Sequence, residues 1–153
     1  MTRFQHILVP VDFGAAMHPG IDLAVVLARK FDSRVTLVHA FDISPFTAIS
    51  PLATPVIDVE PLLETAEKEL KDVLSKVRVE WPKSEAVIRR GRTEEVILDV
   101  AKGLGCGLIV IGTHGRRGVA RVLLGSIAEK IVRMSPIPVL TVHPLPQADS
   151  PGA

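Results

Sequence analysis

The segment from Gly107 to His143 constrains the fold more strongly than any other part of the chain. It opens with an uninterrupted apolar run, Leu108 to Ile111, which is typical of a strand covered on both faces of its sheet. Gly112 ends the run, and no acidic residue occurs between Gly112 and Ser126. The interval is instead rich in glycine and basic residues: Gly115, Gly118, Gly125, His114, Arg116, Arg117 and Arg121. This composition indicates a loop that binds an anion.

Ser126 is the predicted start of the next helix. The sequence Ser126-Ile127-Ala128-Glu129 fits the capping-box pattern S-x-x-E. Free backbone N–H groups and the positive end of the helix dipole would then point back at the loop. Glycine lets a backbone approach phosphate oxygens closely and can supply N–H groups from left-handed conformations. Turn glycines alone are common, but their coincidence with a strand end, an arginine cluster and a capped helix favours phosphate binding.

The glycine spacing resembles the signature G-x2-G-x9-G-[ST] of ATP-binding universal stress proteins. Gly112, Gly115, Gly125 and Ser126 match it at every fixed position. Further segments resemble the family in the expected order: Val9-Pro10-Val11-Asp12-Phe13, Leu37-Val38-His39 and Pro138-Val139-Leu140-Thr141-Val142. The resemblance therefore covers the chain from about Phe4 to His143.

The resemblance implies a set of ATP-binding residues. Gly115, Gly125 and Ser126 match phosphate-holding positions, with Gly112 and the backbone of Ile111 nearer the nucleoside. Pro10, Val11 and Ala40 match neighbours of the adenine. The complete expected set is Pro10, Val11, Asp12, Ala40, Ile111, Gly112, Gly115, Arg116, Gly125, Ser126 and Ile127.

Asp12 has two interpretations. It follows the first predicted strand, where an aspartate is often a turn or helix-entry residue. The resemblance instead makes it a contact on the ribose or Mg²⁺ side of the nucleotide, through a carboxylate that suits a hydroxyl or this cation. Gly14 stands where the family commonly has serine or threonine, so one hydroxyl contact is missing. His39 and His114 are given no general-base role, and Arg116 is favoured among the loop arginines because it adjoins Gly115.

Apolar periodicity predicts alternating strands and helices. The expected strands are Phe4 to Val11, Arg34 to Phe41, Ala86 to Ile88 with an extension to Arg90, Leu108 to Ile111, and Ile137 to His143. The expected helices are Pro19 to Asp32, a long helix marked by Leu62 to Val77, a helix capped by Thr93 and ended by Gly103 and Gly105, and Ser126 to Met134. This alternation predicts an α/β fold with an open five-stranded parallel sheet and helices on both faces. The resemblance implies the strand order 3-2-1-4-5.

Length and composition predict one domain over residues 1–143 of the 153, which the resemblance implies to be nucleotide-binding, followed by a disordered tail over 144–153. Proline-rich Asp42 to Asp58 is either a flap near the ligand or a passive connector. The net charge of +1 argues against a general nucleic-acid or membrane surface. Cys106 is expected to be a small packed residue, and the chain is expected in the cytoplasm because Met1 to His6 precedes too short an apolar run for a signal peptide.

Two functions from different classes remain open at this point. The favoured one is an ATP-binding regulatory module of the stress response, with Mg²⁺ accompanying the nucleotide and a protein partner that the sequence does not identify. The alternative is a slow ATP or nucleotide hydrolase that uses the same pocket, although no positioned base is evident. The absence of G-x-x-x-x-G-K-[ST] and of a G-x-G-x-x-G after the first strand excludes the P-loop and dinucleotide-binding motifs.

A homodimer is expected through the fifth strand, Ile137 to Val142. In the order 3-2-1-4-5 this strand lies at the edge of the sheet, with unpaired backbone groups and no lysine to deter pairing. Pro138 is tolerated at an edge, since only one side of such a strand needs its donors.

Overall fold

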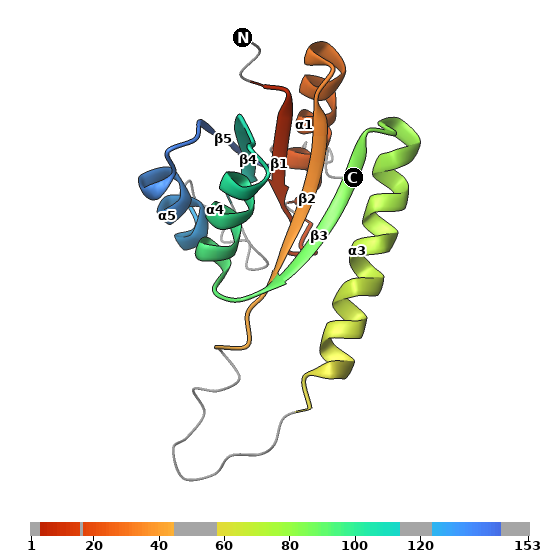
Figure 1. Ribbon diagram of the computed structural model, residues 1–153, viewed down its shortest axis with the longest axis vertical. Helices are drawn as coiled ribbons and strands as arrows, with labels where there is room; N and C mark the ends of the chain where they lie inside the picture. Colours follow the sequence, from red (N-terminus) through yellow and green to blue (C-terminus); the bar gives the residue numbers. More distant parts are fainter. Residues whose placement is uncertain (1–3, 16, 45–57, 114–123, 145–153) are drawn as a thin grey trace, which may run out of the picture.

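The computed structural model describes residues 4–15, 17–44, 58–113 and 124–144. The strands are β1 (His6–Pro10), β2 (Arg34–Phe41), β3 (Ser84–Arg90), β4 (Leu108–Gly112) and β5 (Val139–Val142). The helices are α1 (Met17–Phe31), α3 (Glu60–Glu80), α4 (Thr93–Gly103) and α5 (Ser126–Met134). The strands form one parallel sheet in the order β3-β2-β1-β4-β5, which confirms the predicted fold class and strand order (Figure 1).

The sheet is covered on both faces, and its central strands β1 and β4 are apolar along most of their length. Side chains alternate between faces along a strand, so Ile7 and Val9 of β1 pack with α1, whereas Leu8 between them packs against α4 and α5. The side chains of β4 alternate in the same way: Val110 packs on the face covered by α1, and Ile109 packs on the face covered by α4. Figure 1 shows α4 and α5 together on one side of the sheet.

The boundaries of several elements differ from the sequence-based expectations. β3 reaches the expected end at Arg90 but begins earlier than Ala86, because Ser84 and Glu85 also pair with β2. β5 is shorter than Ile137 to His143. Its preceding residues form a turn in which Ser135 Oγ accepts the Ile137 N–H, and Pro138 lies outside the strand.

Helix capping was predicted wrongly for α4. Arg92 occupies the N-cap position without a side-chain cap, and Thr93 is the first helical residue. The Thr93 N–H instead bonds the Asp42 carboxylate, which lies just beyond β2 and also accepts bonds from Ser44. The hydroxyl and N–H of Ser44, the Thr93 N–H and the Arg92 charge lower the pKa of Asp42. A helix terminus can be satisfied from another element, which a local sequence pattern does not reveal.

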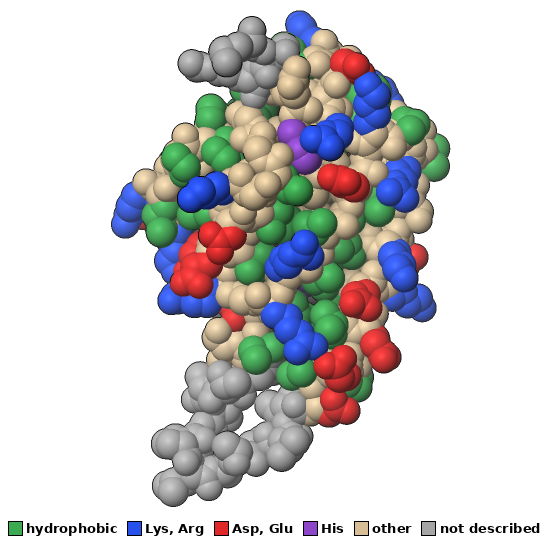
Figure 2. All heavy atoms as spheres, viewed as in Figure 1, with side chains coloured by type: hydrophobic (Ala, Val, Ile, Leu, Met, Phe, Trp, Pro, Cys, Tyr) green, Lys and Arg blue, Asp and Glu red, His purple; other side chains and the backbone are tan. Residues whose placement is uncertain are grey.

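Cys106 is buried between α4 and β4, as expected for a small packed residue. Desolvation raises the pKa of its thiol to about 11. Figure 2 shows Lys and Arg side chains interspersed with Asp and Glu over the visible face, in keeping with the net charge of +1. Within the residues described, no helix is both long and apolar enough to cross a membrane.

Candidate functional site

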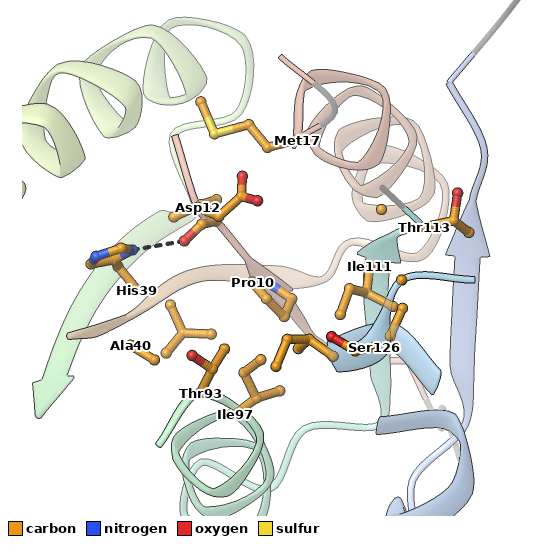
Figure 3. A pocket seen from close by; sticks show the side chains of 16 residues that line it. Pro10, Asp12, Met17, His39, Ala40, Thr93, Ile97, Ile111, Thr113 and Ser126 are labelled. Carbon is orange, nitrogen blue, oxygen red and sulfur yellow. Dashed lines mark hydrogen bonds between the residues drawn. The ribbon is translucent and has the colours of Figure 1, made fainter. Parts of the chain in front are cut away.

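A cavity of about 190 Å³ lies beyond the carboxyl ends of β1, β2 and β4. The central strand β1 is where the chain order reverses, since β2 lies on one side of it and β4 on the other. Crevices of this kind at the carboxyl edge of an open α/β sheet are the usual place for a ligand. The first turns of α1, α4 and α5 complete the walls, through Met17, Thr93 and Ser126 (Figure 3).

Every described member of the predicted nucleotide-binding set lines this cavity: Pro10, Val11, Asp12, Ala40, Ile111, Gly112, Gly125, Ser126 and Ile127. These residues come from three strands and one helix, so the fold brings together positions more than a hundred residues apart in the chain. The predicted members Gly115 and Arg116 lie outside the described residues, as does His114.

One end of the cavity is apolar. Ala40 and Val38 extend from β2, Ile111 from β4 and Ile97 from α4. Val38, Ile97 and Ile111 are buried, while Ala40 and Pro10 remain partly accessible from the cavity (Figure 3). An apolar slot of this kind suits a flat heteroaromatic group, whose faces gain from burial without a need for hydrogen bonds.

Asp12 forms a tight turn at the rim. Its Oδ1 accepts the Gly14 N–H at 2.9 Å, which is the turn role that an aspartate after a strand often has. Phe13 between them has φ 63°, a left-handed conformation that is unusual for a bulky residue and tends to occur at functional sites. Its ring lies 4.4 Å from that of His39, and His39 Nδ1 contacts the carbonyl oxygen of Val11 at 2.8 Å (Figure 3). These contacts hold the end of β1 against the end of β2.

The capping box predicted at Ser126 is wrong. Gly125 is the N-cap of α5, Ser126 is the first helical residue, and no N-cap side chain bonds the helix. Glu129 is one position too far along for the box and pairs with Arg133 instead. The Ser126 hydroxyl therefore stands at the cavity wall without a capping role. The φ of Gly125 is −56°, which any residue adopts, so no left-handed turn requires glycine at this position.

A buried carboxylate joins the two helices beside the cavity. Glu94 in the first turn of α4 lies 3.3 Å from Lys130 Nζ on α5 and 3.3 Å from an Arg92 nitrogen. Its side chain is only 10% exposed. The backbone N–H at the helix start, the Lys130 hydrogen bond and the Arg92 charge lower its pKa against the opposing effect of burial. This ion pair fixes α4 relative to α5, whose first turns both line the cavity.

Several residues that line the cavity were not in the predicted binding set: Met17, Val38, His39, Thr93, Ile97, Thr113 and Ala128. The rule that ligands bind at the carboxyl edge would have indicated Met17 and Thr93, because each begins the helix after a strand that ends there. No local signal marks Ile97 or Ala128, whose apolar spacing predicts only a buried helix face. In the described ranges no group of three or more His, Cys, Asp or Glu side chains is arranged to hold a metal ion.

Comparison with known proteins gives a family for this geometry. The model of the universal stress protein family matches residues 3–143. The chain belongs to the universal stress protein family. Universal stress protein MJ0531 of Methanocaldococcus jannaschii is 31% identical over 140 residues, covering 91% of this chain and 82% of that protein.

Solved structures of the family share the fold. Universal stress protein UspA from Lactobacillus plantarum matches with a TM-score of 0.73 and 26% identity, over 92% of this chain and 98% of that one. A universal stress protein from Archaeoglobus fulgidus, solved in complex with dAMP, matches with a TM-score of 0.60 and 20% identity, over 90% of this chain and 97% of that one. At that identity the likeness concerns the fold alone.

Proposed function

We propose that this universal stress protein binds ATP in the cavity at the carboxyl ends of β1, β2 and β4 and acts as a nucleotide-dependent regulatory protein. The observation that carries the proposal is the convergence of the glycine signature with an apolar slot. Gly112, Gly125 and Ser126 share one cavity with Val11 and Ala40, although they come from separate parts of the chain. The dAMP complex of the Archaeoglobus fulgidus relative supports an adenine nucleotide as the ligand.

The two ends of the cavity suit the two ends of the nucleotide. The slot between Ala40, Ile97 and Ile111 takes the adenine, and the first turn of α5 takes phosphate oxygens. Free N–H groups and the helix dipole favour negative charge there, and the Ser126 hydroxyl can donate a further bond. Gly115 and Arg116 stay predicted phosphate contacts, because they lie outside the described residues.

In the proposed site Mg²⁺ binds together with the phosphates of the nucleotide. Asp12 is the carboxylate that lines the cavity, and its Oδ1 is engaged by the Gly14 N–H. One carboxylate is typical of sites in which Mg²⁺ is held mainly by phosphate and water. The residues therefore fit an ion delivered with the nucleotide, and Asp12 would orient it from the ribose side.

A thermal-shift titration tests the proposal. At ATP one hundred times above Kd the native state gains about 2.7 kcal/mol, which for a domain of this size raises Tm by roughly 5 to 10 °C. GTP with Mg²⁺ is the control, because its base carries different polar groups into the same apolar slot. A Tm unchanged by millimolar ATP and Mg²⁺ contradicts the proposal, and counting of released phosphate separates binding from slow hydrolysis.

The proposal includes a homodimer formed through β5. This strand is the sheet edge beyond β4, and its residues Val139 to Val142 are only partly buried in the single chain. Val132 and Met134 at the adjoining end of α5 are 46% and 57% exposed. An apolar edge with unpaired backbone groups favours pairing with an identical strand about a two-fold axis.

A further inference from the structure

Thr113 occupies a junction at the rim of the cavity. It follows the last residue of β4 and is only 1% exposed. Its N–H donates to the carbonyl oxygen of Val142 at 3.0 Å, and its own carbonyl oxygen accepts the Gly125 N–H at 2.7 Å. Since Gly125 is the N-cap of α5, one residue joins the ends of β4 and β5 to the start of the helix that faces the cavity.

The side chain of Thr113 adds a contact that the sheet does not require. Its Oγ1 lies 3.1 Å from Nδ1 of His143, the first residue after β5, and 3.4 Å from the Val142 carbonyl oxygen. In Figure 3 Thr113 stands beside β5 at the rim of the cavity. His143 is exposed and does not line the cavity. The contact with Thr113 therefore links an exposed residue beyond β5 to the rim of the cavity.

The contact holds with either tautomer of the imidazole. With Nδ1 unprotonated, the Thr113 hydroxyl donates to it. With Nδ1 protonated, the ring donates to Oγ1 and the hydroxyl turns to the Val142 carbonyl oxygen, its second neighbour. A hydroxyl can reverse its role in this way, whereas a methyl group in its place would leave the buried junction without the bond.

We propose that the Thr113–His143 contact is a latch through which the carboxyl end of β5 fixes the first turn of α5, which makes His143 a positioning residue for nucleotide binding. The inference rests on the proposed function, because it concerns how that site is held. The route runs from His143 to Thr113 Oγ1, along Thr113 to its carbonyl oxygen, and from there to the Gly125 N–H. Release of the latch by a change at His143 alters no residue that lines the cavity but lets the α5 N-terminus move away from the phosphates.

The test compares ATP affinities of the full chain by calorimetric titration. Thr113→Val removes the hydroxyl at nearly constant shape, and His143→Ala removes the ring from an exposed position. Each single change should weaken ATP binding about three- to tenfold, the effect of one hydrogen bond. The double variant should be no weaker than the worse single variant, since both changes remove the same contact.

Rescue and control variants separate positioning from a general loss of structure. Thr113→Ser keeps the hydroxyl, and His143→Asn keeps a polar atom near the place of Nδ1, so both should bind ATP within about twofold of the unmodified protein. Thr141→Val makes the same Thr-to-Val change on β5, outside the cavity, and should leave the affinity unchanged.

The outcomes distinguish this inference from the proposed function. If the unmodified protein binds ATP and the His143→Ala protein binds it equally tightly, the latch is rejected while the ATP site stands. Additive losses in the double variant also reject the latch. If the unmodified protein binds no ATP, both the proposed function and the latch are rejected.

Discussion

Glu94 of α4 and Lys130 of α5 are joined by an ion pair of 3.3 Å that lies beside the first turns of both helices. The Glu94 side chain is 10% exposed and that of Lys130 is 47% exposed, so the carboxylate depends on the pair more than the ammonium does. Glu94→Gln keeps the shape and removes the charge. We expect a loss of about 1.5 to 3 kcal/mol in the free energy of unfolding, the range for hydrogen bonds to charged groups.

The Glu94–Lys130 pair also predicts that the free energy of unfolding depends on pH. Its pKa is lowered in the folded protein from an ordinary value of 4.5, chiefly by the backbone at the start of α4 and then by Lys130. The carboxylate of the unfolded chain therefore takes up a proton first as the pH falls. The free energy of unfolding that Glu94 contributes is present above pH 4.5 and lost as the pH falls below it. Urea unfolding between pH 7 and pH 3 should show a smaller acid loss for Glu94→Gln than for the unmodified protein. Equal acid losses would contradict this role.

The Cys106 thiol should react slowly with thiol reagents as long as the chain is folded. Burial raises the pKa of its thiol from 9.0 to about 11, so almost no thiolate is present near pH 8. A thiol-reactive disulfide dye should label the native protein far more slowly than the protein in urea. The thiol of the unfolded chain ionises first as the pH rises. The free energy of unfolding that this group contributes is therefore present below pH 9 and lost as the pH rises to about 11. Rapid native labelling would contradict the buried position.

Replacement of Gly125 tests whether the backbone approaches the ligand closely at this position. Its φ of −56° accommodates any residue, so Gly125→Val should fold, with a loss of about 1 kcal/mol at the N-cap. The added side chain stands at the cavity wall, and ATP binding should weaken roughly tenfold or more. Gly103→Val is the matched control, because a Cβ there meets no atom within 4 Å. Normal ATP affinity of a folded Gly125→Val protein would reject the phosphate cradle.

The carboxyl edge of the sheet was predictable because its signals are local. The apolar run Leu108 to Ile111 marks a strand covered on both faces, and the glycine spacing after it indicates Gly112 at the end of that strand and Gly125 beside the start of the next helix. The strand order needed more than periodicity, since an alternation of strands and helices is compatible with several orders. It came from the family resemblance, and the structure confirms it.

The capping prediction for α5 failed because the helix starts one residue earlier, with Gly125 as its N-cap. The prediction for α4 failed because the partner of the helix start lies outside the local sequence. Asp42, which bonds the Thr93 N–H, lies 51 positions earlier in the chain. The Glu94–Lys130 pair and the Thr113–His143 contact likewise join residues 36 and 30 positions apart. Contacts of this kind carry no signature in composition or spacing, and only the folded chain reveals them.

The β5 edge predicts a dimer in solution. Light scattering at tens of micromolar should give twice the chain mass of 16.5 kDa. Leu140→Lys places a charge on the partly buried edge and should shift the protein towards monomer without loss of ATP binding, because Leu140 does not line the cavity. Val79→Lys on α3 is the control, since Val79 is 86% exposed. A monomer at that concentration would reject the dimer.

Equilibrium dialysis of radiolabelled ATP against the purified chain measures the proposed nucleotide binding itself. With Mg²⁺ present, the account predicts saturable binding of one ATP per chain, displaced by unlabelled ATP and strongly reduced in the Gly125→Val protein but not in the Gly103→Val protein. Absence of saturable binding at millimolar ATP by the folded, unmodified chain would contradict it.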